Sequence, residues 1–423
     1  MAEQRGFPSG QAAAEWRAKW TLVLAATLGF SVVGMSIYSL GAFFKPLHEA
    51  FGWDRTLISA GPTVYAATSL ICQPFVGRMI DRWGPRRIAL IGVVLSAISY
   101  ALFATANGSP TGWLLLWLLY SLSVQLILMS TWSSAVASEF EAGRGLALAF
   151  TLGGSALSGV VAPISALLLI EAYDWRTAFV VIALVTGLIV LVASWFFFHS
   201  RLDTRRTAVA TAQDAALPGL SLSEAFRTSS FYKLSFGIFL GYMMPVASLV
   251  HMLPILEENG LAPAKAAGVA ALFGIFAMIG KIIGGALVNR VGGQLLAAAV
   301  IAIAVPGYLI IMSPGQPALL LSLAVALLGA SAGGQLHMLV YLTTRHFGMR
   351  AFGSIFGFIG SSVIIAGGSG PLVAGRLYDY FGNYQVMLMV GIPMAAIGTL
   401  LLLWLGDYPE VRQARRLARA AAE

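Results

Sequence analysis

Charged residues are scarce in this sequence of 423 amino acids. Asp, Glu, Lys and Arg together make up 10% of it, whereas hydrophobic residues make up 58%. Soluble domains contain roughly 25% charged residues and about 45–50% apolar ones. A soluble fold has too little interior to hide this much apolar surface, so the composition predicts a protein whose main solvent is lipid.

Cysteine and histidine are scarce as well. The single cysteine, Cys72, lies in an apolar stretch, which excludes a disulfide framework and a cysteine metal site and is typical of a small buried hydrophobe. The five histidines form no cluster with Asp or Glu along the chain. Because no nucleotide-binding loop is present, ATP-driven pumping by this chain is not expected. We therefore expect no enzyme activity, no metal and no cofactor beyond a coupling proton or counter-anion.

The formal net charge of +8 does not indicate a nucleic-acid-binding protein. The basic residues are spread between apolar runs instead of forming one basic domain, so we expect no nucleic-acid partner. Residues 1–19 are polar and of mixed charge, without the short apolar core and cleavage site of a signal peptide. They are predicted to be a retained cytoplasmic tail.

Twelve apolar runs follow one another along the chain. In lipid, backbone polar groups must pair within the protein, so the runs are either helices or barrel strands. They are continuous and long, which favours helices over the alternating pattern of a barrel. An all-α membrane protein with twelve transmembrane helices is therefore predicted, with spans at residues 20–44, 57–80, 88–106, 112–136, 146–170, 178–198, 231–256, 266–288, 295–312, 318–343, 352–377 and 386–405.

The polar stretch at residues 200–230 separates the runs into two sets of six. It divides the chain into a tail (1–19), an N-terminal half (20–199), a cytoplasmic linker (200–230), a C-terminal half (231–405) and a basic tail (406–423). With both termini on one side, about 20 Lys and Arg residues fall on that side and about 5 on the other. The positive-inside rule therefore predicts that both termini are cytoplasmic.

The two halves carry repeated motifs at corresponding helix ends. Residues 77–84 have the sequence GRMIDRWG and residues 285–292 have GALVNRVG. Each has Gly, three residues, Asp or Asn, Arg, one residue and Gly. A second pair precedes the fifth and eleventh runs, with FEAGRG at residues 140–145 and FGMRAFG at residues 347–353. The repeats predict two similar six-helix, pseudo-symmetric halves.

Six plus six helices with repeated loop motifs is the plan of the major facilitator superfamily, which this chain resembles over its whole length. Residues 77–87 are similar to the signature that the superfamily carries between its second and third spans. A glycine there permits close helix approach, an acidic group at a helix end can accept backbone N–H bonds, and the arginines meet cytoplasmic water and anionic headgroups. The resemblance implies a gating and topology role for Gly77, Asp81, Arg82, Arg86, Arg144, Asn289, Arg290 and Arg350.

Two points qualify this role. Asn289 replaces the carboxylate that the signature would have in the second half, which weakens a charge-based latch, although Asn can still cap a helix. The alternative for the whole motif is a basic loop that only fixes topology.

A narrower resemblance rests on two further motifs. Residues 38–47 have the sequence YSLGAFFKPL, followed by FGWDR at residues 51–55, and residues 173–179 have YDWRTAF. Together they are similar to the monocarboxylate transporter branch, which includes oxalate/formate antiporter relatives. The alternative is that these aromatic residues are ordinary anchors at the membrane interface.

Lys281 is the one ionisable group deep within an otherwise apolar predicted span. It lies eight residues, or about 12 Å, from Asn289 at the predicted cytoplasmic end. A cation there costs about 2.5 kcal/mol or more, so it should face a watery cavity or bind an anion. Gly280, Gly284 and Gly285 favour close helix packing around it. Proton coupling, an internal counter-ion and snorkelling without function are the alternatives.

The narrower resemblance implies a role for Lys281. Transporters of that branch carry an arginine at this place, which binds the substrate carboxylate. Lysine keeps the charge but loses the planar fork. Proton-coupled animal members also have an aspartate where this chain has Ala277 and a coupling lysine where it has Tyr38. The usual proton relay is therefore missing, and coupling is expected to use Lys281 itself or the exchange of one anion for another.

Other polar side chains within the predicted spans are candidates for lining a substrate cavity. A hydrogen bond to a neighbouring helix is the alternative for each of them. His337 and Tyr341 are four residues apart and stack on one helix face, from which Gln335 is offset. His251 and His337 are the next candidates for handling protons. The substrate-site prediction comprises Lys281, Tyr38, Gln125, Trp132, Tyr242, Gln335, His337 and Tyr341.

The sequence thus predicts a secondary active transporter that moves a small organic anion, a monocarboxylate first of all, by alternating access. We expect it to be a monomer in the plasma (inner) membrane. The alternative is an efflux transporter for drugs or other metabolites. Such transporters usually carry a Gly-Pro pair in the fifth span, whereas here Pro163 follows Ala162. A membrane-bound sensor is not favoured, since the chain has no soluble signalling domain.

Overall fold

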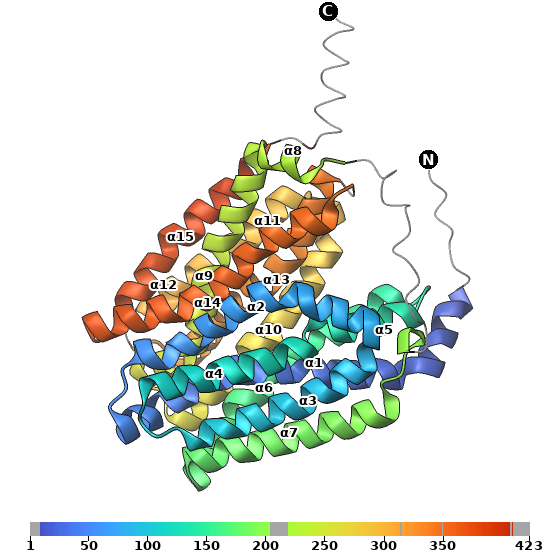
Figure 1. Ribbon diagram of the computed structural model, residues 1–423. Helices are drawn as coiled ribbons and strands as arrows, with labels where there is room; N and C mark the ends of the chain where they lie inside the picture. Colours follow the sequence, from blue (N-terminus) through green and yellow to red (C-terminus); the bar gives the residue numbers. More distant parts are fainter. Residues whose placement is uncertain (1–8, 204–218, 314, 349, 407, 409–423) are drawn as a thin grey trace, which may run out of the picture. The chain divides into compact units, whose positions relative to one another are not determined.

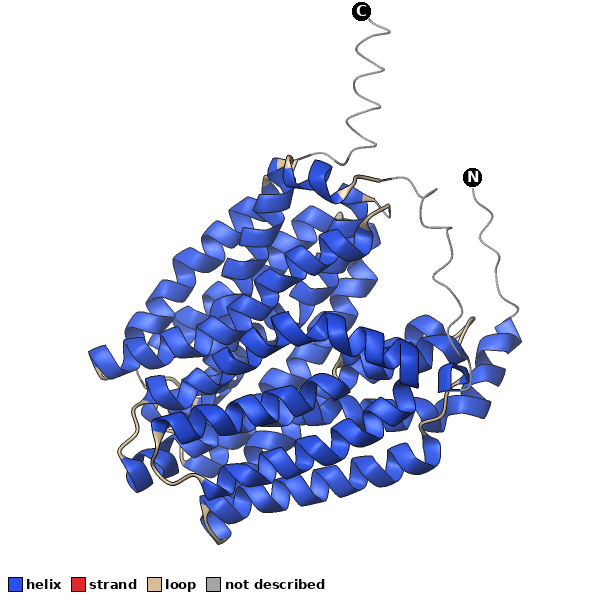
Figure 2. Cartoon of the chain, in the orientation of Figure 1, coloured by secondary structure: helices blue, strands red, loops and turns tan. Residues whose placement is uncertain are grey.

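The computed structural model describes residues 9–203, 219–313, 315–348, 350–406 and 408. Within these ranges every regular element is a helix, apart from one isolated β-bridge between Gly219 and Gly348 (Figure 2). The chain divides into two compact units, an N-terminal unit (Met1–Val209) and a C-terminal unit (Ala210–Glu423). The division falls inside the stretch of residues 200–230 that was predicted to link the halves.

The N-terminal unit is a bundle of long helices (Figure 1). A short 3-10 turn divides the fourth span into two successive helices. In chain order the elements are α1 (Ser9–Phe51), α2 (Arg55–Trp83), α3 (Pro85–Ala101), η1 (Leu102–Thr105), α4 (Pro110–Val124), η2 (Gln125–Ile127), α5 (Met129–Glu139), α6 (Arg144–Ala172), α7 (Trp175–Phe197) and η3 (Arg201–Asp203).

The C-terminal unit repeats this plan after one short helix. Here the third span is the one that is broken, between α11 and α12, whereas the fourth is one continuous helix. The elements are α8 (Leu222–Phe226), α9 (Ser229–Glu258), α10 (Pro263–Val291), α11 (Gly293–Ala302), α12 (Ala304–Met312), α13 (Ala318–Phe347), α14 (Phe352–Phe381) and α15 (Gln385–Leu403).

Twelve helical segments of the described chain match the twelve predicted spans in order. Eleven of them are long and apolar enough to cross a membrane. The exception is α2, which has 29 residues and is long enough but more polar than the others. It corresponds to the predicted span at residues 57–80.

The largest difference from the predicted boundaries lies at the N-terminus. A tail was predicted for residues 1–19, but α1 is already helical from Ser9. The reason is that residues 9–19 make contacts with other parts of the N-terminal unit. The pattern of apolar runs in the sequence does not reveal such contacts. The predicted basic tail at residues 406–423 lies outside the described residues except for Gly406 and Tyr408.

Short polar residues begin several of the helices. Asp54 accepts a hydrogen bond from the backbone N–H of Leu57, 2.7 Å away, at the start of α2. Asp174 accepts from the backbone N–H and the hydroxyl of Thr177 at the start of α7, which lowers the pKa of its carboxyl group. These bonds satisfy N–H groups that have no partner inside the helix, and they fix where the chain turns between spans.

The last glycine of each repeated motif forms the junction between two helices. Gly84, between α2 and α3, has φ 80° and ψ 152°, and Gly292, between α10 and α11, has φ 89° and ψ 128°. Residues with a Cβ rarely adopt this conformation. The motif therefore repeats because both halves turn in the same way at this point.

Replacing Gly84 by Ala is expected to destabilise the protein by about 1–3 kcal/mol, because Ala is strained at this backbone conformation. Gly292→Ala should behave alike. Thermal unfolding in detergent measures the effect.

The matched control is Gly77→Ala. Gly77 is inside α2, and no atom of the described chain lies within 4 Å of a Cβ added there. This variant should be neutral or slightly stabilised. Equal destabilisation by all three substitutions would show that the junction geometry is not what these glycines provide.

Candidate functional site

Lys281 belongs to α10, which lies directly against α13 (Figure 1). Glycines allow the two backbones to touch. A Cβ on Gly280 would collide with the backbone of Ala330, and one on Gly333 would collide with the carbonyl of Ala277. Contacts of this kind hold helices together in lipid, where apolar burial alone gives little. The predicted role of the glycines around Lys281 in close packing is visible at Gly280.

Lys281 and His337 lie on the same side of this helix pair. Gly285 is one turn beyond Lys281 on α10, and a Cβ there would be 3.9 Å from Cδ2 of His337 on α13. Both side chains are partly exposed. The C-terminal unit thus brings together two of the predicted site residues, a cation and a group that can exchange a proton.

Ala277 lies one turn before Lys281. The proton-coupled transporters that the chain resembles have an aspartate at this position. Ala277 is buried, and its carbonyl faces Gly333 across the helix contact. Its small side chain adds no proton-exchanging group to the surroundings of Lys281.

Gln335, also on α13, is nearly fully buried, with 1% of its surface exposed. Its side-chain amide donates to the carbonyl of Gly241, 3.0 Å away, and to the hydroxyl of Ser331, 3.3 Å away. The bond to Gly241 joins α13 to α9, so Gln335 connects two helices. Tyr242, the next residue on α9, is partly exposed.

Tyr341 is one turn beyond His337 but packs elsewhere. A Cβ on Gly293 would collide with its ring, so the ring covers the first residue of α11. It joins an apolar cluster that includes Leu339, Leu342 and Phe347. The spacing of four residues on α13 therefore does not give Tyr341 the same neighbours as His337.

In the N-terminal unit, Gln125 and Trp132 are internal. The Gln125 amide donates to the hydroxyl of Ser69 on α2, 2.9 Å away, and 1% of the residue is exposed. The Trp132 indole donates to the carbonyl of Ile127, 2.7 Å away, and its ring covers Gly29 of α1. Both side chains lie where the fourth span is broken.

Tyr38, on α1, differs from these two residues because it is partly exposed. Within the described residues, the predicted substrate-site side chains therefore separate into two groups. Gln125, Trp132 and Gln335 are buried and bonded to neighbouring parts of the same unit. The partly exposed group comprises Lys281, His337, Tyr38, Tyr242 and Tyr341.

The predicted gating residues of the first half lie at the ends of α2, α3 and α6. Asp81 is exposed, and no hydrogen bond or ion pair is found for it with the described part of its own unit. Arg82 is exposed beside the ring of Trp83, 6.0 Å away. The close helix approach predicted at Gly77 is not made within this unit, where its surroundings are open.

Arg86 and Arg144 are more firmly held. The Arg86 guanidinium donates to the carbonyl of Trp195, 2.6 Å away, and its backbone N–H donates to Asp203. Arg144 donates from Nε to the carbonyl of Phe140, 2.8 Å away. These bonds connect the start of α3 with the end of α7 and fix the chain entering α6.

The corresponding residues of the second half are less strongly bonded. Arg290 is exposed in the last turn of α10. Arg350 lies 3.9 Å from the carboxylate of Glu224, with both side chains about half exposed, so this ion pair adds little stability. The side chain of Asn289 lies outside the described part of the structure.

The two motifs that suggested the monocarboxylate branch pack against each other. Phe43 from the first motif stacks on Phe179 from the second, with ring centroids 3.9 Å apart and planes 11° apart. Phe51 and Trp175 meet edge to face at 5.7 Å, and Arg176 lies over the rings of both. The motifs therefore form one aromatic contact between the end of α1 and the start of α7. Packing of the rings against one another is thus a reason for the aromatic residues of both motifs, beside anchoring at the membrane interface.

A carboxylate cluster at the start of α1 was missed by the sequence analysis. Lys19 donates to a side-chain oxygen of Glu139, 2.8 Å away, and to its carbonyl, 2.7 Å away. The other carboxylate oxygen of Glu139 accepts from the backbone N–H of Arg201. Glu15 accepts from the backbone N–H groups of residues 141–143, before α6. These bonds attach the first turns of α1 to α5, α6 and η3.

Glu139→Gln should loosen the start of α1, because Lys19 would lose its charged acceptor in a setting where Glu139 is only 11% exposed. A loss of about 1–2 kcal/mol of local stability is expected. Hydrogen exchange of residues 9–19 in detergent should accelerate by about 5–30-fold.

Glu171→Gln is the matched control, since Glu171 is exposed at the opposite end of α6. It should leave the exchange rates of residues 9–19 unchanged. Unchanged rates in Glu139→Gln as well would contradict the role of this cluster in ordering the start of α1.

His251 is fully buried in α9. Its Nδ1 is 2.8 Å from the hydroxyl of Tyr384, and its Nε2 is 3.1 Å from the carbonyl of Pro371 on α14. Since a carbonyl can only accept, Nε2 carries a proton and donates to it. The sequence predicted His251 as a proton-handling candidate, and the structure places it in a bonded contact between α9, α14 and the start of α15.

A comparison with protein families matches residues 26–360 to the Major Facilitator Superfamily. The match covers most of the chain, which therefore belongs to this superfamily of transporters. The predicted family and its twelve-helix fold are confirmed. The family and the relatives are transporters, in agreement with the prediction that the chain is not an enzyme.

Several characterised and uncharacterised proteins are similar to the chain. Monocarboxylate transporter 13 of Bos taurus is 23% identical, covering 92% of this chain and 89% of its own. The hexuronate transporter of Escherichia coli K12 is 22% identical, covering 88% and 91%. The uncharacterised transporter YcxA of Bacillus subtilis is 26% identical, covering 66% and 67%.

Among solved structures, the nucleoside transporter NupG has the same fold. The TM-score is 0.72, with 12% sequence identity and coverage of 91% of this chain and 98% of that one. At this identity the likeness supports the fold and says nothing of the cargo.

Proposed function

We propose that this chain is a secondary active transporter of small organic anions, with Lys281 as the group that binds the substrate carboxylate. The observation that carries the proposal is the position of Lys281. It is a partly exposed cation in the middle of an apolar helix, beside a close glycine contact and near His337. A charge at this depth is costly unless it serves a polar cavity or an anion.

The relatives support an anionic cargo. Two of them are named for carboxylates, namely monocarboxylates and hexuronate. Their low identity leaves the particular anion open to experiment. Alternating access of the two halves around a central site is the transport mode that we propose, as for other carriers built from two repeats.

Coupling is proposed to use Lys281 and His337, or to use a second anion. The aspartate of the resembling proton-coupled transporters is replaced by Ala277. When an anion binds, the two neighbouring groups can both be protonated without net repulsion, and its release favours loss of one proton. Exchange of one anion for another needs no proton group. The protein is proposed to work as a monomer in the plasma (inner) membrane with both termini cytoplasmic.

Lys281→Ala should reduce uptake of labelled carboxylates into proteoliposomes by about 10-fold or more. The reason is the loss of a charge-assisted bond worth about 1.5–3 kcal/mol. Lys281→Arg keeps the charge and offers a planar fork, so it should retain or improve the apparent affinity for carboxylates.

The control is Lys45→Ala, which removes an exposed cation at the end of α1. It should transport like the wild type. If Lys281→Ala transported carboxylates as well as the wild type, the anion-site proposal would be wrong. Transport of uncharged drugs by both proteins would favour the efflux alternative.

His337→Gln tests the coupling proposal separately. If His337 exchanges the coupling proton, uptake by the variant should no longer be stimulated by a pH gradient across the membrane, whether the vesicle interior is acidic or alkaline. The variant should still exchange one anion for another. Retention of the full gradient effect would remove His337 from the coupling mechanism. Loss of exchange as well would indicate a role in binding.

A further inference from the structure

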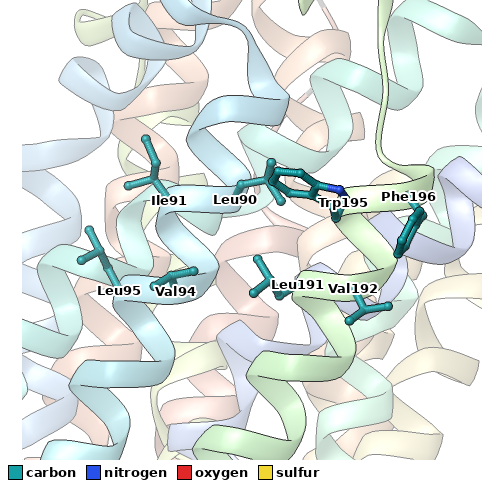
Figure 3. A pocket seen from close by; sticks show the side chains of 8 residues that line it. All are labelled: Leu90, Ile91, Val94, Leu95, Leu191, Val192, Trp195 and Phe196. Atoms are coloured by element: carbon teal, nitrogen blue, oxygen red, sulfur yellow. The ribbon is translucent and has the colours of Figure 1, made fainter.

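An apolar groove of about 620 Å³ runs between α3 and α7 of the N-terminal unit. Figure 3 shows its two walls, and the Trp195 indole reaches from α7 towards Leu90 on α3. Among the residues that the structure describes, no charged or hydroxyl side chain lines it. The lining residues are Leu90, Ile91, Val94, Leu95, Leu191, Val192, Trp195 and Phe196.

The groove opens on the surface of helices that are long and apolar enough to span a membrane. Ile91, Val192, Trp195 and Phe196 are each between 46% and 64% exposed. In a bilayer these side chains contact something apolar. Helices that pack against each other in lipid meet through small residues, whereas these walls are built of large branched and aromatic side chains. The shape and chemistry of the groove favour a flexible acyl chain over another helix.

Positive charge is concentrated at one end of the groove. Arg87 is in the first turn of α3, and Leu90, Ile91 and Val94 follow it at spacings of three, four and seven residues. They therefore share one helix face, with exposed Arg87 where the apolar wall ends.

Arg86, the neighbouring residue, holds the two walls together at this end. Its guanidinium donates to the carbonyl of Trp195 and lies 5.9 Å from the centre of its ring. Asp203, an acidic residue at this end, accepts from the backbone N–H groups of Arg86 and Ser200. The carboxylate of Asp203 is thus engaged by backbone donors, and Arg87 is an exposed cation at this end of the groove.

We propose that this groove is a binding site for an anionic phospholipid. One acyl chain lies between α3 and α7 against Trp195, and the headgroup phosphate pairs with Arg87. A zwitterionic lipid can place the same chain in the groove, but its positive group offsets the attraction of the phosphate to Arg87. Anionic lipids are concentrated in the cytoplasmic leaflet, on the side that the distribution of Lys and Arg predicts for this end of α3.

The test uses fluorescence quenching of the full-length protein in vesicles by lipids with brominated acyl chains. The signal of Trp195 is the difference between the wild type and Trp195→Phe, since the chain has 10 tryptophans. At equal mole fraction, brominated phosphatidylglycerol should quench Trp195 more than brominated phosphatidylcholine does.

Arg87→Gln should lower this preference for the anionic lipid by about fivefold, the factor expected for one arginine near a membrane surface. The matched control is Arg227→Gln, which removes an exposed arginine from the C-terminal unit. It should keep the preference. Equal quenching by both lipids in the wild type, or an equal loss of preference in both variants, would overturn the proposal.

Val94→Phe tests the groove itself by filling it. It should reduce quenching of Trp195 by either lipid, whereas Leu188→Phe, at an exposed position of α7 outside the groove, should not. Protection of Trp195 from both lipids in the wild type would mean that another protein surface covers the groove, and would overturn the proposal too.

Discussion

Lipid offers no hydrogen bonds, and this constraint governs where polar groups can lie in the protein. Backbone groups are satisfied inside helices, and many polar side chains within the spans donate to a carbonyl or hydroxyl of the same unit. Gln125, Gln335 and Trp132 all do so. A charged side chain such as Lys281 costs more in lipid than these groups, and it is stabilised by water, by an opposite charge or by polar groups of the protein.

Glycine makes the environment of that charge possible. The contact of Gly280 with Ala330, and of Gly333 with Ala277, brings α10 and α13 to backbone contact. At such a short distance, a long side chain on one helix and an imidazole on the next can share one side of the pair. The close packing that stabilises the unit and the juxtaposition of Lys281 with His337 thus have the same cause.

The order of the twelve spans could be predicted from the sequence, because each span needs a long apolar run. The turns after α2 and α10 could also be anticipated, since the motifs end in Gly84 and Gly292, whose positive φ angles require glycine. The helical start of α1 could not, because Lys19 depends on Glu139, which is 120 residues away. Sequence position also could not separate Gln335 from His337, since a polar residue that bonds a neighbouring helix and one that stays partly exposed look the same until the neighbours are known.

The most direct test of the account is solute counterflow by the wild-type protein with matched pairs of substrates that differ in one charge, such as lactate and lactamide or glucuronate and glucose. Proteoliposomes loaded with one unlabelled compound would be diluted into a solution that contains the same compound in labelled form. If Lys281 binds the substrate carboxylate, at least one carboxylate should accumulate, and its neutral partner should not. Accumulation of a neutral compound to the same extent as its carboxylate would contradict the assignment of Lys281 as a carboxylate-binding group.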